Sequence, residues 1–105
     1  GWGLVSFEHG ACRRPQIVPA HTSCKDIWEK SGQLIDIGTW CWDKDLSVKR
    51  GVVSTKHAAQ LLEDLYKDAG LYAHTANACY EVTQRPEYRW QSVSGGFDAA
   101  IKELV

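Results

Sequence analysis

The chain has 105 residues, of which 44% are hydrophobic and 24% charged, and its formal net charge is −1. This length suits one domain, since autonomous domains cluster at about 100–150 residues. The balance of charged and apolar residues excludes an intrinsically disordered chain, and the near-zero charge argues against a general nucleic-acid binder. No apolar run approaches the roughly 18 residues of a membrane-spanning helix. We therefore expect a single domain over residues 1–105 without a membrane span.

Alternating apolar residues, prolines and capping residues predict the elements in the first half of the chain. These are a strand over 3–9, a loop over 10–19, a short helix from Thr22 or Ser23 to Gly32, a strand over 34–42 and a charged turn over 43–51.

The clearest predicted element is an amphipathic helix over 54–69. Its apolar residues recur at helical spacing and form one stripe: Ala58, Leu61, Leu62, Leu65, Tyr66 and Ala69. Ser54 or Thr55 is a good N-cap, and Gly70 suits the left-handed residue that ends a helix.

In the second half, β-branched and aromatic residues predict a strand over 71–83, a returning strand over 88–93 and a final helix over 97–105. The two strands are expected to pair as a hairpin. The whole pattern predicts an α+β fold, an α/β sandwich with a mainly antiparallel sheet and two to three helices on one face.

Four cysteines occur in the chain, at Cys12, Cys24, Cys41 and Cys79, and there is no methionine. An even number of cysteines in a small domain is typical of a disulfide framework and a secretory route. We therefore predict two disulfides, with three possible pairings that the sequence leaves open. The opening Gly1-Trp2-Gly3 fits a processed, secreted product.

Two chemical alternatives compete with this interpretation. Two His-x-x-Cys units, His9 to Cys12 and His21 to Cys24, could supply zinc ligands, although they would leave Cys41 and Cys79 unused. His9 and His21 also flank Arg13 and Arg14, a possible anion site that a small secreted ribonuclease could use for acid–base catalysis. No nucleophile motif is present, so we expect no catalytic residues. The His-x-x-Cys units lack the glycines usual after paired cysteine ligands, so we expect no metal, and we expect no cofactor either.

Five tryptophans are many for a chain of this size. Trp40 and Trp42 should share one face of their strand, opposite Cys41. With Trp90 and Arg89 they would form either a core layer, which is the default for indoles, or an exposed surface that binds a protein or cell-surface target.

Lys49-Arg50 is a dibasic pair in the predicted charged turn, and it is a candidate site for a secretory processing protease. Strand pairing or packing would have to protect it if it stays uncut in the mature protein.

The segment Thr39-Trp40-Cys41, followed by the predicted helix over 54–69 and further strands, resembles the virus-encoded killer toxins of smuts and yeasts and related secreted fungal effectors. The resemblance covers 39–93 in the order of elements. It implies a secreted α/β sandwich that acts by binding a protein or cell-surface target, without chemistry of its own, and it assigns no functional residue.

Overall fold

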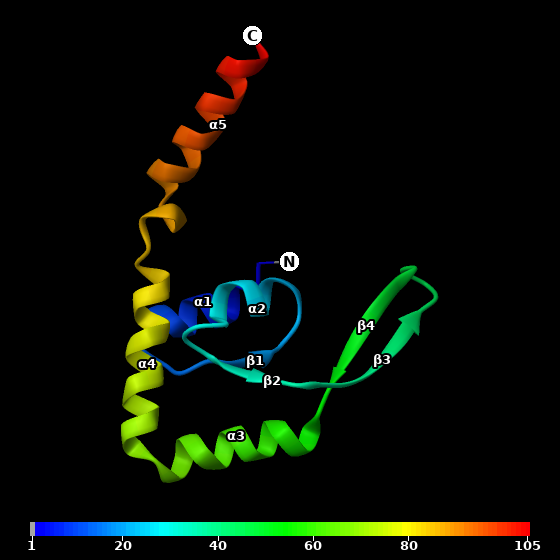
Figure 1. Ribbon diagram of the computed structural model, residues 1–105. Helices are drawn as coiled ribbons and strands as arrows, with labels where there is room; N and C mark the ends of the chain where they lie inside the picture. Colours follow the sequence, from blue (N-terminus) through cyan, green and yellow to red (C-terminus); the bar gives the residue numbers. More distant parts are fainter. Residues whose placement is uncertain (1) are drawn as a thin grey trace.

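The computed structural model describes residues 2–105, so Gly1, the first residue of the predicted domain and of its processed terminus, lies outside the described residues. Figure 1 shows a small central body from which a β-hairpin and a C-terminal helix project in different directions. The Cα radius of gyration is 16.8 Å and the principal extents are 54 × 40 × 18 Å, whereas a compact chain of this length has a radius near 13 Å. The two projecting elements account for the difference.

The body begins with α1 (Leu4–Ala11), where a strand was predicted. Gly3 precedes the helix with a positive φ of 77°, a conformation that glycine adopts without steric cost. The helical turn brings Phe7 and Gly10 onto the side that faces Trp28, with Phe7 packed on the core and Gly10 touching the indole. The alternation of apolar residues over 3–9 was therefore too short to distinguish a strand from a helix.

A small β-α-β unit follows, made of β1 (Ile17–Pro19), α2 (Thr22–Trp28) and β2 (Gln33–Ile35). The strands β1 and β2 pair in parallel, with Val18 opposite Leu34. The predicted short helix is confirmed, although it ends at Trp28 rather than at Gly32. Its last turn delivers Ile27 and Trp28 to the core.

After Asp36 the chain forms the hairpin of β3 (Ile37–Asp43) and β4 (Val48–Val53). The predicted strand over 34–42 is thus divided between two sheets, and the predicted charged turn contains most of a strand. A break in the register between Ile37 and Thr39 marks a bulge at the base of the ribbon.

Helix α3 (Thr55–Lys67) confirms the amphipathic helix, and Ser54 caps it by accepting the backbone N–H of His57 at 3.2 Å. It does not end at Gly70, however, because α4 (Ala69–Thr83) begins at once and Asp68 caps it by accepting the N–H of Leu71 at 2.8 Å. A strand had been predicted over 71–83. The buried residues of α4 instead recur at helical spacing: Thr75, Ala76, Cys79 and Val82.

The chain ends with a 3₁₀ turn, η1 (Pro86–Tyr88), and α5 (Trp90–Leu104). The predicted hairpin between 71–83 and 88–93 is therefore wrong. The predicted final helix exists but begins seven residues earlier, at Trp90 rather than Phe97. Figure 1 shows α5 extending away from the body.

The core lies between α1, α2, β1 and α4. Its buried side chains are Val18, Ile27, Trp28, Cys79 and Val82, with Phe7, Cys24, Leu34 and Tyr88 packed against them. Trp28 is wholly buried, and its indole N–H donates to the Ser6 hydroxyl at 3.2 Å.

The predicted sandwich with a mainly antiparallel sheet is wrong. Among residues 2–105 the strands form two separate two-stranded sheets, one parallel and one antiparallel, accompanied by five α-helices. The fold remains α+β, but helices build most of its core because α1 and α4 replace predicted strands. The start of α5 also replaces a predicted strand, but it contributes no buried residue.

Candidate functional site: the tryptophan face of the β3–β4 hairpin

One face of the hairpin is aromatic, and we call it the tryptophan face: Trp40, Trp42, Lys49 and Gly51. Trp40 lies opposite Gly51 and Trp42 opposite Lys49, so the alternation of the strands places all four on the same side. Trp40 is 46% and Trp42 62% exposed. The default prediction that these indoles form a core layer is therefore wrong, and the alternative prediction of an exposed aromatic surface describes them.

The tryptophan face is anchored to the body at its base. The imidazole of His21 meets Trp40 edge to face, with ring centroids 5.0 Å apart. A Cβ on Gly51 would lie 3.2 Å from both the His21 ring and the Ile37 side chain. Because residue 51 is glycine, His21 and Ile37 can approach the strand backbone there. Trp42, further toward the tip, has no such cover among residues 2–105 and stays exposed.

A second contact fixes the direction in which the hairpin leaves the body. The backbone N–H of Asp36 donates to Nδ1 of His57 at 3.0 Å, and the N–H of Ser54 donates to the carbonyl of Asp36 at 2.8 Å. Both residues that flank the ribbon are thereby tied to the first turn of α3.

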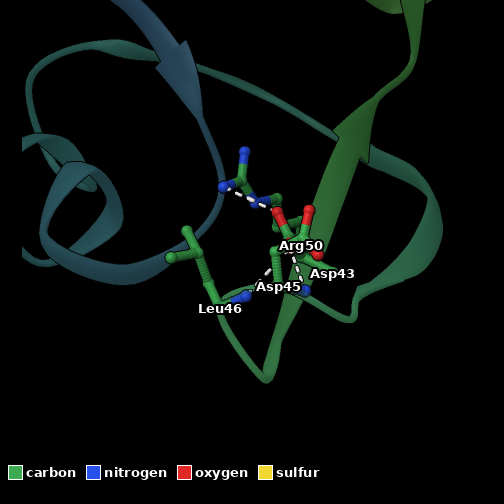
Figure 2. Close-up of polar contacts among 4 residues, drawn as sticks. All are labelled: Asp43, Asp45, Leu46 and Arg50. Carbon is green, nitrogen blue, oxygen red and sulfur yellow. Dashed lines mark hydrogen bonds and ion pairs between the residues drawn. The ribbon is translucent and has the colours of Figure 1, made fainter.

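The tip of the hairpin is held by one carboxylate. Asp43 accepts the backbone N–H groups of Asp45 and Leu46, each at 3.1 Å, and pairs with the Arg50 guanidinium at 2.8 Å (Figure 2). Ser47 closes the turn with a positive φ of 51°. These contacts set the register that brings Trp42 opposite Lys49.

Lys49 adds a positive charge to the tryptophan face, with its ammonium 4.8 Å from the centre of the Trp40 ring. An ammonium at this distance from an indole makes a cation–π contact. Arg50 points to the opposite face and is neutralised by Asp43. The proposed processing pair Lys49-Arg50 is therefore part of a paired strand.

Trp90 and Arg89, which were predicted to join this surface, belong to another one. Arg89 precedes α5 and Trp90 begins it, and Trp90 is 82% exposed. The hairpin was not predicted, since the charged residues around Lys49 suggested a turn. Val48 and the Val52-Val53 pair were the available signals of a strand.

The predicted anion site does not converge on one point. The Arg13 guanidinium donates to the Asn77 side chain at 2.9 Å and stacks on the Tyr80 ring, so it is engaged with α4. His21 instead contacts the hairpin, and Arg14 lines a shallow groove beside Tyr66 and Tyr72. His9 lies in the last turn of α1.

The predicted disulfides are wrong, because all four cysteines are free and lie too far apart to be bridged. Cys79 is completely buried in α4, and its thiol contacts the carbonyl of Ser31 at 3.4 Å. Burial raises the pKa of the Cys79 thiol, which keeps it protonated. Cys12 and Cys41 are exposed, and Cys24 is half-buried.

Within residues 2–105, no three His, Cys, Asp or Glu side chains are grouped closely enough to hold a metal ion. The two His-x-x-Cys units therefore do not assemble into one ligand set there.

No helix in the described part of the chain has the length and apolar character needed to cross a membrane, as the sequence predicted. Comparison of the chain with protein-family models, curated proteins and solved structures finds no match in any of the three.

Proposed function

We propose that this protein acts by binding a protein target through the tryptophan face of the β3–β4 hairpin, without catalysis. The observation that carries the proposal is the exposure of Trp40 and Trp42 side by side on a ribbon that projects from the body (Figure 1). Tryptophan is enriched in the residues that dominate binding energy at protein interfaces.

The surroundings of the two indoles support recognition rather than folding. An isolated two-stranded ribbon is only marginally stable in water. A projecting ribbon that exposes two indoles is therefore better explained as a surface that a partner covers than as an element that stabilises the fold. His21 fixes the base and Asp43 fixes the tip, which reduces the entropy lost on binding. Lys49 favours a target that is apolar at its centre and acidic at its edge.

A toxin or effector role would be one use of such binding, and it stays a prediction from the sequence. Secretion also stays a prediction, and the free cysteines remove its strongest support.

The test compares a Trp40→Ala/Trp42→Ala variant with a Val52→Ala control, since Val52 is exposed on the other face of the same ribbon. Candidate targets are proteins captured by the wild type and by Val52→Ala. Each is then purified and titrated directly. We expect the double variant to bind at least about 30-fold more weakly, as for interface hot spots, and the control to bind like the wild type. Equal binding by all three proteins would refute the proposal.

The rival proposal, a ribonuclease that uses His9 and His21 with Arg13 and Arg14, predicts RNA cleavage that is lost in His9→Ala/His21→Ala. The divergent contacts of Arg13 and His21 do not favour it. If the wild type cleaves RNA and both histidines are required for the cleavage, the ribonuclease proposal replaces the binding proposal.

A further inference from the structure

The helix α5 has an apolar stripe that the rest of the chain leaves uncovered. The stripe, defined as Trp90, Val93, Phe97, Ala100, Ile101 and Leu104, follows the spacing of a helix that pairs with another helix. None of the residues Trp90–Leu104 is buried. The large members are mostly exposed: Trp90 82%, Phe97 69%, Ile101 57% and Leu104 87%.

A helix in this position needs a partner to be stable. An isolated helix of 12–15 residues is marginal in water even with good helix formers, and α5 contains Gly95 and Gly96 at its centre. Each glycine inside a helix costs roughly 0.5–1 kcal/mol relative to alanine. A Cβ on either glycine would meet nothing within 4 Å, so packing inside one copy does not require them.

The apolar stripe continues into a cavity of about 580 Å³ where α5 leaves the body. Trp90 and Val93 line it from α5, and Trp2, Leu4, Phe7 and Tyr88 line it from the body. The rings of Trp2, Phe7 and Tyr88 pack against one another with centroids 5.2–5.8 Å apart, so this wall is already formed.

We propose that a second copy of this chain covers this surface, with the two α5 helices packed antiparallel about a two-fold axis at Phe97. Trp90 of each copy then meets Leu104 of the other, and Val93 meets Ile101. The C-terminal turn of each α5 lies over the cavity of its partner copy. Gly96, the residue before Phe97, lies at the flank of the apolar stripe near the axis, whereas Gly95 lies on the opposite side of the helix.

The area agrees with such a dimer. The exposed parts of Trp2, Leu4 and the apolar stripe offer roughly 700 Å² per copy, taking 150–250 Å² for a full aromatic side chain. This exceeds the largest apolar patch of a typical monomer, about 300–600 Å², and approaches the roughly 800 Å² per partner of a stable interface.

Charge distinguishes a second copy from a lipid surface. The charged residues of 89–105 are Arg89, Asp98, Lys102 and Glu103, which sum to zero, whereas helices that lie on membranes carry a strongly basic polar face. In the antiparallel arrangement Glu103 of one copy comes within a helical turn of Arg89 of the other.

The test is the mass of the full chain in solution, measured by sedimentation at about 1–100 µM protein. This range covers the dissociation constants of weak to moderate complexes. We expect a concentration-dependent dimer of twice 11.8 kDa. Phe97→Asp should weaken the dimer at least about tenfold, as for a central interface residue. Because Phe97 is exposed and outside the core, this variant should keep the wild-type near-ultraviolet circular dichroism, which reports on the packed aromatic residues of the body, even if α5 loses helicity. Lys102→Asp on the polar face of α5, and Trp42→Ala on the hairpin, should dimerise normally.

The direction of pairing is tested with Glu103→Cys in a chain where the exposed Cys12 and Cys41 are serine. Antiparallel pairing separates the two introduced thiols by about 18 Å along the helix axis, so oxidation should form no cross-link. A cross-linked dimer would overturn the antiparallel arrangement. A wild type that stays monomeric at 100 µM would overturn the dimer, and if that monomer adsorbs to phosphatidylcholine vesicles through α5, the surface belongs to lipid instead.

Discussion

The indole of Trp28 packs directly on the backbone of Gly10, so closely that a Cβ on this glycine would lie 2.6 Å from Cη2 of the ring. The contact joins α1 to α2 at the centre of the core. The Thr83 methyl group, 3.2 Å from the same position, brings α4 into it. Because Gly10 has no side chain, α1, α2 and α4 can all pack around the Trp28 indole.

We predict that Gly10→Ala destabilises the fold although alanine is the better helix former. The ring of Trp28 is wholly buried and cannot move without displacing the core, and overpacking of this kind costs about 1–3 kcal/mol. Urea denaturation followed by circular dichroism measures the change. Gly95→Ala, in the exposed α5, is the matched control and should not lower the stability of the body.

The free cysteines predict a graded reactivity toward a thiol reagent such as DTNB in the native protein. Cys12 and Cys41 should react fast, Cys24 more slowly, and Cys79 only after unfolding, because their exposure falls in that order. Four reactive thiols should appear in denaturant without any reductant. Failure to find them would restore the disulfide interpretation.

The stability of the protein should fall as the pH rises above about 8.5, the usual pKa of an unfolded cysteine. Burial raises the pKa of Cys79 in the folded state, so above this pH the unfolded chain loses a proton that the folded chain keeps. Deprotonation then favours unfolding, by at most about 1.4 kcal/mol per pH unit. Denaturation midpoints between pH 7 and 10 measure the slope. Cys79→Ala should flatten it, and Cys41→Ala should not.

The hairpin tip offers a pair of substitutions that separates the ion pair from the turn contacts. Asp43→Asn keeps an oxygen that can accept the N–H groups of Asp45 and Leu46 but loses the attraction to Arg50. Exposed ion pairs contribute about 0–1 kcal/mol, so we expect a small effect.

Asp43→Ala loses both kinds of contact and should loosen the tip. Amide hydrogen exchange over 42–49 is the measurement, with faster exchange expected in the order wild type, Asp43→Asn, Asp43→Ala. If the asparagine variant exchanges as fast as the alanine variant, the ion pair rather than the turn holds the tip.

Local signals in the sequence predicted α3 because its apolar stripe and its Ser54 cap both lie within one helix. They failed for α4, where Tyr72, Val82 and Thr83 favour a strand by composition. The spacing of Thr75, Cys79 and Val82 is nevertheless helical, and the neighbouring Asp68 is a good cap. Tertiary packing against α1 and α2 decided the outcome, as often happens when propensity is weak.

The candidate site was predictable in part. Alternation correctly placed Trp40 and Trp42 on one face, but whether that face is buried depends on what lies opposite, and this is a long-range property. Trp28, the indole that does form the core, was predictable only as one residue on the face of a short helix. Trp90 was expected beside Trp40 and Trp42 because a strand was predicted over 88–93. In the structure Trp90 begins α5 instead, so it lies away from the β3–β4 hairpin.

In this extended shape, the residues that stabilise the fold and the residues of the two proposed binding surfaces are separate. The residues that hold the body together, centred on Trp28 and Cys79, are not those of the tryptophan face or of the apolar stripe on α5. Each arm can therefore exchange its outward side chains with little effect on whether the polypeptide folds. Substitutions on the hairpin or on α5 can therefore change what the protein binds, at each element separately, without changing the residues that stabilise the core.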